Sequence, residues 1–294
     1  MSTLLTIAVT TRLSETEISS VLGLVAKAVA VDQAPALNEA ALLQLRRTHA
    51  ATKHLLMSEN EELVGYAQLA SGPEWSAGQL VVAPDHRRQG IGTQLLQRLI
   101  MESTTPLRVW AMGDTPAARA LAAGAGMVRR RELLIMERPL DDEPPEPVVP
   151  RGVRIRTFEA GQDEREWLRV NAAAFAQHPE QALIDIDDLK DRMAEPWFDP
   201  TGFFVAMRDN AMIGFHWTKQ HDDQLGEVYV LGVAPWAAGH GLGKALLLTG
   251  LRSLQERGST RVELYVESDH EAAIQLYLTY GFATASRDVM YAQS

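Results

Sequence analysis

The sequence predicts an α/β protein built from two similar halves in tandem. Three observations predict it. Apolar runs of strand length alternate with amphipathic helical segments, a glycine-rich turn follows one strand in each half, and both halves repeat the same order of elements. At 294 residues with 46% apolar content, the chain is long enough for two domains with substantial cores.

Charge and composition narrow the class of function. The net charge of −10 disfavours broad binding to nucleic acid or to anionic membranes. The sequence has no cysteine, which excludes disulfides, thiolate nucleophiles and cysteine-ligated zinc. Residues 1–9 lack a basic region and a long apolar stretch, so no signal peptide or membrane span is expected. We therefore expect a cytoplasmic, monomeric protein that acts on a small molecule.

A segment rich in proline and acid separates the halves. Residues 139–151 predict an extended linker, because proline interrupts both helices and sheets. The expected domains are residues 1–138 and residues 152–294.

The first half begins with a strand over residues 4–9. Ser14 and Glu17 have the spacing of a capping box, which predicts a helix from this point. A second helix is expected after Asn38, and strands are expected near Leu55 and over residues 63–69.

The second half repeats this order. The strands and helices expected there lie at 153–156, 164–174, 186–193, 203–207, 213–219 and 227–233.

Each half carries a glycine turn between a strand and a helix, at residues 88–92 and 239–243. Setting Ala83-Pro84 on Ala234-Pro235 superposes the two turns, which indicates gene duplication. Glycine lets backbone N–H groups approach an anion closely, and the following helix directs unpaired amides at the same spot. Each turn therefore predicts a phosphate cradle.

Two other phosphate-binding motifs fit the second turn poorly. A P-loop needs Ser or Thr after its lysine, but Ala245 follows Lys244. A dinucleotide-binding fingerprint would need its third glycine at Lys244.

The first turn instead follows the pattern Arg/Gln-x-x-Gly-x-Gly, the second turn follows it except at Ala238, and a late helix of the second half leads into Gly281-Phe282. On these features each half resembles the GCN5-related N-acetyltransferase family. Further strings of the second half resemble tandem members of that family, at residues 171–180, 197–200, 214–219, 226–233 and 264–269.

The resemblance covers nearly the whole chain and is denser after the linker. It implies a twisted, mostly antiparallel sheet flanked by helices in each half. It also implies acetyl-CoA as the acetyl donor, no metal, and an amine acceptor. For the tandem members that these strings resemble, the acceptor implied is the cysteinyl amine of cysteinyl-glucosaminyl-inositol.

The same resemblance implies the residues that hold acetyl-CoA. In the second half they are Leu231, Gly232, Val233, Ala238, Gly239, His240, Gly241, Leu242, Gly243, Lys244, His270, Glu271, Ala272, Ala273, Ile274 and Gln275. In the first half they are Leu80, Val81, Val82, Arg88, Gln89, Gly90, Ile91, Gly92 and Thr93. Two positions depart from the family pattern: Ala238 stands where Arg or Gln is usual, and His270 where Asn is usual.

Amide formation from an amine and a thioester needs a base for the amine and a proton for the departing thiolate. Glu227 opens the strand that leads to the turn and is the expected base, acting through a water. Tyr277, on the late helix, is the acid that the resemblance implies. The aligned residues of the first half are Ser76 and Ala122, so we expect that half to be non-catalytic.

The acceptor site rests on the resemblance, which implies Glu39, Glu180, Lys219, Glu227 and Tyr265 as contacts. Glu39 and Lys219 also have an ordinary interpretation as solvated surface charges. His178 and His216 lack metal-ligand spacing and are interpreted as structural or surface residues.

Two alternatives stay open at the level of sequence. The acceptor is another amine, such as an aminoglycoside, a polyamine or a protein amino terminus. Alternatively, the chain is a non-catalytic sensor of acyl-CoA, an alternative that Glu227 and Tyr277 disfavour.

Overall fold

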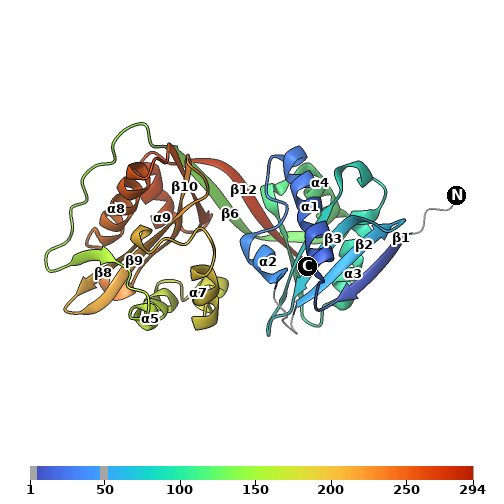
Figure 1. Cartoon of the computed structure of the whole chain (residues 1–294), viewed down its shortest axis with the longest axis horizontal. Coiled ribbons are helices and arrows are strands. Elements are labelled where there is room, and N and C mark those ends of the chain that lie inside the picture. The colour runs from blue at the N-terminus through green and yellow to red at the C-terminus, as the bar shows by residue number, and fades with distance from the viewer. Residues whose placement is uncertain (1–4, 47–51, 294) are drawn as a thin grey trace. The chain divides into compact units, whose positions relative to one another are not determined.

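The computed structural model describes residues 5–46 and 52–293. The chain divides into two compact units (Figure 1). Unit 1 comprises Met1–Leu134 and Ser286–Ser294, and unit 2 comprises Ile135–Ala285. Among the described residues, no helix is both long enough and apolar enough to cross a membrane.

The first half of the chain contains six strands, four α-helices and two short 3₁₀ helices within its described residues. In order they are β1 (Leu5–Thr10), α1 (Glu15–Asp32), α2 (Glu39–Gln44), β2 (Thr52–Glu59), β3 (Glu62–Ala70), β4 (Ser76–Val82), η1 (Pro84–His86), α3 (Ile91–Glu102), β5 (Leu107–Ala111), η2 (Met112–Asp114), α4 (Pro116–Gly124) and β6 (Met127–Pro139). The predicted capping box at Ser14 and Glu17 and the cap at Asn38 are confirmed. Leu4, where the first strand was expected to start, lies outside the described residues.

The second half repeats the pattern. Its elements are β7 (Arg154–Thr157), α5 (Glu164–Ala174), α6 (Pro179–Ala182), α7 (Ile186–Met193), η3 (Pro200–Gly202), β8 (Phe203–Arg208), β9 (Ala211–Gln220), β10 (Leu225–Val233), η4 (Pro235–Ala237), α8 (Leu242–Glu256), β11 (Arg261–Glu267), α9 (Glu271–Thr279) and β12 (Ala283–Gln293). The predicted helices over 164–174 and 186–193 coincide with α5 and α7.

Each unit has a mixed, mostly antiparallel sheet, as the fold class predicted. The strands of unit 1 lie in the order β1-β2-β3-β4-β5-β12, and those of unit 2 in the order β6-β11-β10-β9-β8-β7. Pairing is antiparallel at β2–β3 and β9–β10, but parallel at β4–β5 and β10–β11.

The compact units differ from the predicted division at 138 and 152, because the last strands change units. β12, from the end of the sequence, pairs with β5, and Val289 and Tyr291 are buried in the core of unit 1. In return, Ile135 and Met136 of β6 belong to unit 2. An alternating strand pattern predicts a buried face but does not name the partner strand, so the sequence did not indicate this arrangement.

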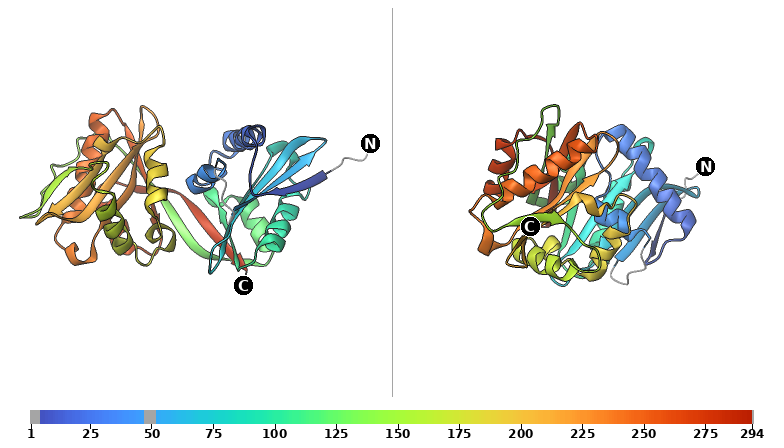
Figure 2. Two further views of the ribbon diagram at one scale, coloured as in Figure 1. Left: turned by 60° about the horizontal axis from the view of Figure 1, so that its bottom comes forward. Right: turned by 60° about the vertical axis from the view of Figure 1, so that its left-hand side comes forward.

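Unit 1 has two hydrophobic cores because successive strand residues point to opposite faces. On β2, Leu55 and Met57 join the core beneath α3, whereas Leu56 joins the core beneath α1 and α2. Figure 2 shows α1 (blue) and α3 (teal) on opposite sides of the strands.

The core of unit 2 is aromatic. Trp167, Phe203 and Trp217 are fully buried, and the rings of Phe203 and Trp217 stack with centroids 4.5 Å apart. His216, the residue before Trp217 on β9, is also fully buried, and its Nδ1 lies 2.7 Å from the carbonyl oxygen of Leu246 on α8. Burial lowers the pKa of His216 to about 4, so the ring is neutral and structural, as its lack of metal-ligand spacing indicated.

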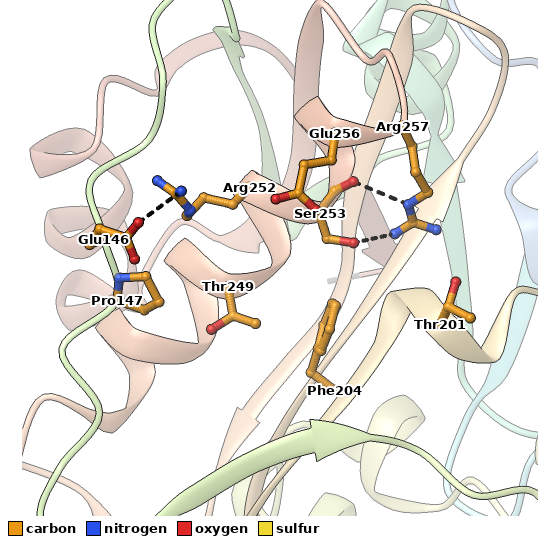
Figure 3. A pocket seen from close by; sticks show the side chains of 9 residues that line it. All are labelled: Glu146, Pro147, Thr201, Phe204, Thr249, Arg252, Ser253, Glu256 and Arg257. Atoms are coloured by element: carbon orange, nitrogen blue, oxygen red, sulfur yellow. Dashed lines mark hydrogen bonds and ion pairs between the residues drawn. The ribbon is translucent and has the colours of Figure 1, made fainter.

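The linker is extended but lies on α8 of unit 2. Arg252 donates to the Pro144 carbonyl (2.8 Å) and pairs with Glu143 and Glu146, while Gln255 donates to the carbonyls of Leu140 and Asp142. Figure 3 shows Glu146 and Arg252 beside a cavity of about 460 Å³. The segment after β6 is therefore fixed to α8 and is not a free tether.

The end of the chain should stabilise unit 1 through Tyr291, whose hydroxyl donates to the buried Asp114 carboxylate (2.7 Å). Tyr291→Phe leaves that carboxylate oxygen short of a partner, which costs about 1–3 kcal/mol. We expect hydrogen exchange to accelerate in β5 and β12. Tyr280→Phe, on a half-buried residue of unit 2, is the control. Unchanged exchange in β5 of Tyr291→Phe would contradict the role given to this strand.

Candidate active site

The two glycine turns have the same backbone conformation. Ala238 has φ −70° and ψ 164°, and the aligned Arg87 has φ −73° and ψ 161°. Gly241 (φ 79°) begins α8, and Gly90 (φ 83°) begins α3. No side chain within the described part of the chain caps either helix, so the first-turn amides remain available to an anion, as the sequence predicted.

One residue of the first turn is strained. Arg88 has φ 64°, in the left-handed region, where the aligned Gly239 has φ 82° without steric cost. The preceding Arg87 is braced, because its guanidinium donates to both carboxylate oxygens of Asp32 (2.6 and 2.8 Å). Arg87 occupies the Arg/Gln position of the motif, one residue before the turn expected at 88–92.

Beside each turn, two parallel strands part. Registered pairs between β10 and β11 end at Val228 and Leu264, although β10 continues to Val233 and β11 to Glu267. A register shift between Val228 and Val230 marks the place. Leu231, Gly232 and Val233 lie beyond it and are paired to β9 on their other side.

Unit 1 parts in the same way. Pairs between β4 and β5 end at Gly78 and Val109, and Leu80, Val81 and Val82 lie beyond. A cavity of about 570 Å³ opens there, between β4, β5, α4 and the turn. Of the residues predicted to hold acetyl-CoA in this half, it is lined by Leu80, Val81, Val82, Arg88, Gly90, Gly92 and Thr93. Ile91 instead belongs to the hydrophobic core, and Gln89 is exposed.

The expected base, Glu227, is only 6% exposed and lies on β10 just before the strands part. It is in register with Lys219 on β9 and with Glu263 on β11, so the three residues lie side by side across the sheet. His221 Nε2 donates to Glu227 Oε2 (2.7 Å) and lies 3.4 Å from Glu263 Oε1. The carboxylate is therefore held in one orientation.

Tyr277, the expected acid, lies on α9 and is 6% exposed. Its ring packs against Phe282 with centroids 5.7 Å apart. Burial raises the pKa of Tyr277 to about 12, so the phenol is protonated at neutral pH and can donate a proton. In unit 1, the aligned Ala122 lines the cavity, and Ser76 is buried in a hydrogen bond with Thr105 (2.7 Å).

The start of α9 accommodates the His270 departure. The Nδ1 atom of His270 accepts the backbone N–H of Ala273 (3.1 Å), so the ring caps the helix. Thr115 caps α4 of unit 1 in the same way, through the N–H of Ala118. Glu271, Ala272, Ile274 and Gln275 follow on α9.

The expected acceptor contacts fall in different surroundings. The Lys219 ammonium lies 4.5 Å from the Trp197 ring centroid and 5.3 Å from that of Tyr229. Tyr265 is 41% exposed, immediately after the last β10–β11 pair. Glu39 is half-buried at the start of α2 in unit 1. The side chain of Glu180 lies outside the described residues.

Sequence reasoning missed His221 and Glu263. The face on which Glu263 lies could have been predicted from strand alternation. Residues 263, 265 and 267 lie on one face of β11, whereas Val262, Leu264 and Val266 are buried on the other. His221 lies in the short loop before β10, where a single histidine gives no pattern of its own. His178, interpreted as structural or surface, is 3.0 Å from Glu267.

The fold and both turns define an acetyltransferase of the GNAT class. Residues 27–127 and 165–282 match the Acetyltransferase (GNAT) family. A tandem GNAT protein from the clavulanic acid biosynthesis pathway has a similar structure, with a TM-score of 0.75 at 21% identity over 98% of both chains. A GCN5-related N-acetyltransferase from Sphaerobacter thermophilus has a TM-score of 0.73 at 21% identity, covering 98% of this chain and 95% of that one.

Closer relatives carry one name. The mycothiol acetyltransferase of Thermomonospora curvata is 50% identical over 95% of this chain and 94% of its own. That of Streptomyces scabiei is 50% identical over 92% of this chain and 90% of its own. The chain belongs to the mycothiol acetyltransferase family.

The strain at Arg88 makes a testable prediction. Because a left-handed non-glycine residue costs roughly 1–2 kcal/mol and glycine adds unfolded-state entropy, Arg88→Gly should stabilise unit 1 by about 0.5–1 kcal/mol. Gln89→Gly, at the next residue of the same turn, should instead destabilise by about 0.5–1 kcal/mol. Chemical denaturation without acetyl-CoA measures both variants, and equal effects would contradict the strain.

Proposed function

We propose that this chain transfers the acetyl group of acetyl-CoA to the cysteinyl amine of cysteinyl-glucosaminyl-inositol, forming mycothiol, and that unit 2 performs the chemistry. One observation carries the proposal. Unit 2 has a buried carboxylate, Glu227, just before β10 and β11 part, and a buried phenol, Tyr277, on α9, at the positions where unit 1 has Ser76 and Ala122. The names of the relatives support the choice of acceptor.

In this proposal, the amides at the start of α8 bind the pyrophosphate of acetyl-CoA, with Ala238 to Lys244 forming the turn. The unpaired edge of Leu231, Gly232 and Val233 aligns the pantetheine arm and the thioester. His270 to Gln275 on α9 complete the site. Ala238 offers no guanidinium, unlike Arg87 in unit 1, so binding depends on backbone donors and on the helix terminus.

The cavity of unit 1 has the same turn and the same parted strands, and we propose that it binds acetyl-CoA without turning it over. Its lining includes Arg87, Arg88 and Thr93 as polar groups beside an apolar channel. The small Ala122 replaces the phenol, so no group at that position protonates a leaving thiolate.

The chemistry then needs two proton transfers in opposite directions. Glu227 takes a proton from the acceptor ammonium through a water, and the neutral amine attacks the thioester carbonyl. A C–N bond forms, and the C–S bond breaks as the tetrahedral intermediate collapses. Tyr277 gives its proton to the departing CoA thiolate and regains one from solvent. The attacking nitrogen, which still carries one proton more than an amide, loses that proton to solvent, and Glu227 also releases its proton to solvent.

Acceptor binding involves Glu180, Lys219 and Tyr265, and the family resemblance adds Glu39. Hydroxyl groups and an ammonium on the acceptor suit carboxylates and other hydrogen-bonding side chains. Tyr265 is 41% exposed and follows the last β10–β11 pair, next to the parting strands. The assignment of Glu39 rests on the family resemblance alone.

A panel of amines tests the acceptor. Acetyl-CoA is incubated with the protein and cysteinyl-glucosaminyl-inositol, spermidine or an aminoglycoside, and products are measured by mass spectrometry. We expect the mass of one acetyl group to be added only to the first. Acetylation of another amine instead would make the protein a different GNAT enzyme, and no product with any amine would favour an acyl-CoA sensor.

Variants test the division of labour between the units. Glu227→Gln and Tyr277→Phe should each lower kcat about 10²-fold or more, since general acid–base groups contribute about 10²–10⁴-fold. Gly243→Ala and Gly92→Ala form a matched pair, because the added Cβ meets only ordinary contacts of 3.6 Å or more in both turns. Gly243→Ala should raise KM for acetyl-CoA.

Gly92→Ala should leave kcat within about twofold of the parent, because the turn of unit 1 supplies no catalytic group. Circular dichroism checks that each variant is folded. Equal losses of turnover from the two glycine variants, with both folded, would contradict the assignment of catalysis to unit 2.

A further inference from the structure

Glu227 has a carboxylate neighbour that works against it. Glu263 is its registered partner on the parallel strand β11, and the side chains of Glu227 and Glu263 are 8% and 14% exposed. Two carboxylates at adjacent positions on one face of a sheet disfavour ionisation of both, and burial strengthens the repulsion. A base in this place needs a compensating positive charge.

His221 is built into the position where that charge is needed. Its Nε2 is 2.7 Å from Glu227 Oε2 and 3.4 Å from Glu263 Oε1. Its backbone N–H donates to the Leu225 carbonyl (2.9 Å), which closes the loop between β9 and β10. Asp222 accepts the backbone N–H groups of Gln224 and Leu225 (2.7 and 2.8 Å), so the loop has a defined shape.

The charges around His221 come from three strands and from its own loop. They are Lys219 on β9, Glu227 on β10, Glu263 on β11 and Asp222. The hydrogen bond to Glu227 is the largest influence and raises the pKa of His221. Burial, followed by the charge of Glu227, raises the pKa of Glu263, whereas His221 acts to lower it.

We propose that His221 is a positioning residue for the acetyl transfer, and that its imidazolium offsets the charge of Glu263 so that Glu227 stays ionised and oriented. This inference rests on the proposed function of Glu227 as the base. It assigns roles to two residues that were not among the expected site residues: His221 is the compensating cation, and Glu263 is the carboxylate whose charge it offsets. The side chain of His221 is about one-third exposed, whereas that of Glu227 is almost fully buried.

The proposal predicts a pH effect. Without the imidazolium, the two carboxylates ionise only at higher pH, so the acidic limb of kcat/KM should move upward. For His221→Gln, we expect an upward shift of about one pH unit, about tenfold lower kcat/KM on that limb, and a largely retained high-pH plateau. The measurement is kcat/KM for the acceptor with the full chain, from about pH 5.5 to about pH 9.

A second substitution distinguishes compensation from simple packing. Glu263→Gln removes the repulsion, so in the His221→Gln background it should return the acidic limb towards its original position. His86→Gln is the matched control, because His86 also pairs with a glutamate, Glu59 at 3.2 Å, but in unit 1. It should not move the limb.

The outcomes separate the two proposals. If His221→Gln lowers the plateau without moving the limb, or if the double variant does not recover, His221 has no compensating role. If Glu227→Gln keeps the parent rate and pH profile, the proposed function itself fails. A shifted limb that recovers in the double variant supports both.

Discussion

The site depends on the unpaired backbone where β10 leaves β11. A strand inside a sheet normally satisfies its amides and carbonyls on both edges, and buried groups without partners are costly. Leu231, Gly232 and Val233 are paired on one edge only, because the β10–β11 ladder ends at Val228 and Leu264. This edge presents backbone N–H donors and C=O acceptors, which suit a ligand that itself carries amide groups. In chain order, the glycine turn and the start of α8 come after β10, and α9 comes directly after β11.

The two units carry the same turn on the same arrangement of strands. Their turns have similar φ and ψ values at Arg87 and Ala238 and at Gly90 and Gly241, and in both units the parallel pair parts after three or four residues. At the two aligned positions the side chains differ. Glu227 and Tyr277 of unit 2 correspond to Ser76 and Ala122 of unit 1, so the acid–base pair that we propose has no counterpart at these positions of unit 1.

The backbone strain at Arg88 is consistent with the duplication that the two aligned turns indicate. The chain keeps the left-handed conformation of Gly239 at the aligned position, although arginine does not favour it. Around it the turn is secured by the ion pair of Arg87 with Asp32 and by the contact of Arg87 with the Val82 carbonyl. Such strain persists where the surrounding structure determines the conformation.

Local signals in the sequence determined much of this protein. Ser14 and Glu17 predicted the start of α1, and the spacing of Gly90 and Gly241 predicted both turns, because capping and turn chemistry act within a few residues. Glu227 was expected to open its strand, but β10 begins two residues earlier, at Leu225.

The tertiary structure decided what depends on residues far apart in sequence. The pairing of β12 with β5 joins residues about 180 positions apart, and the alternating pattern of a strand does not name its partner. The cluster of His221, Glu227 and Glu263 likewise exists only because β10 and β11 pair in one register. Glu227 and Glu263 lie on either side of α8 in the sequence and become neighbours only when the sheet forms. The repulsion between their carboxylates, and the compensation by His221 that we propose, arise from that register.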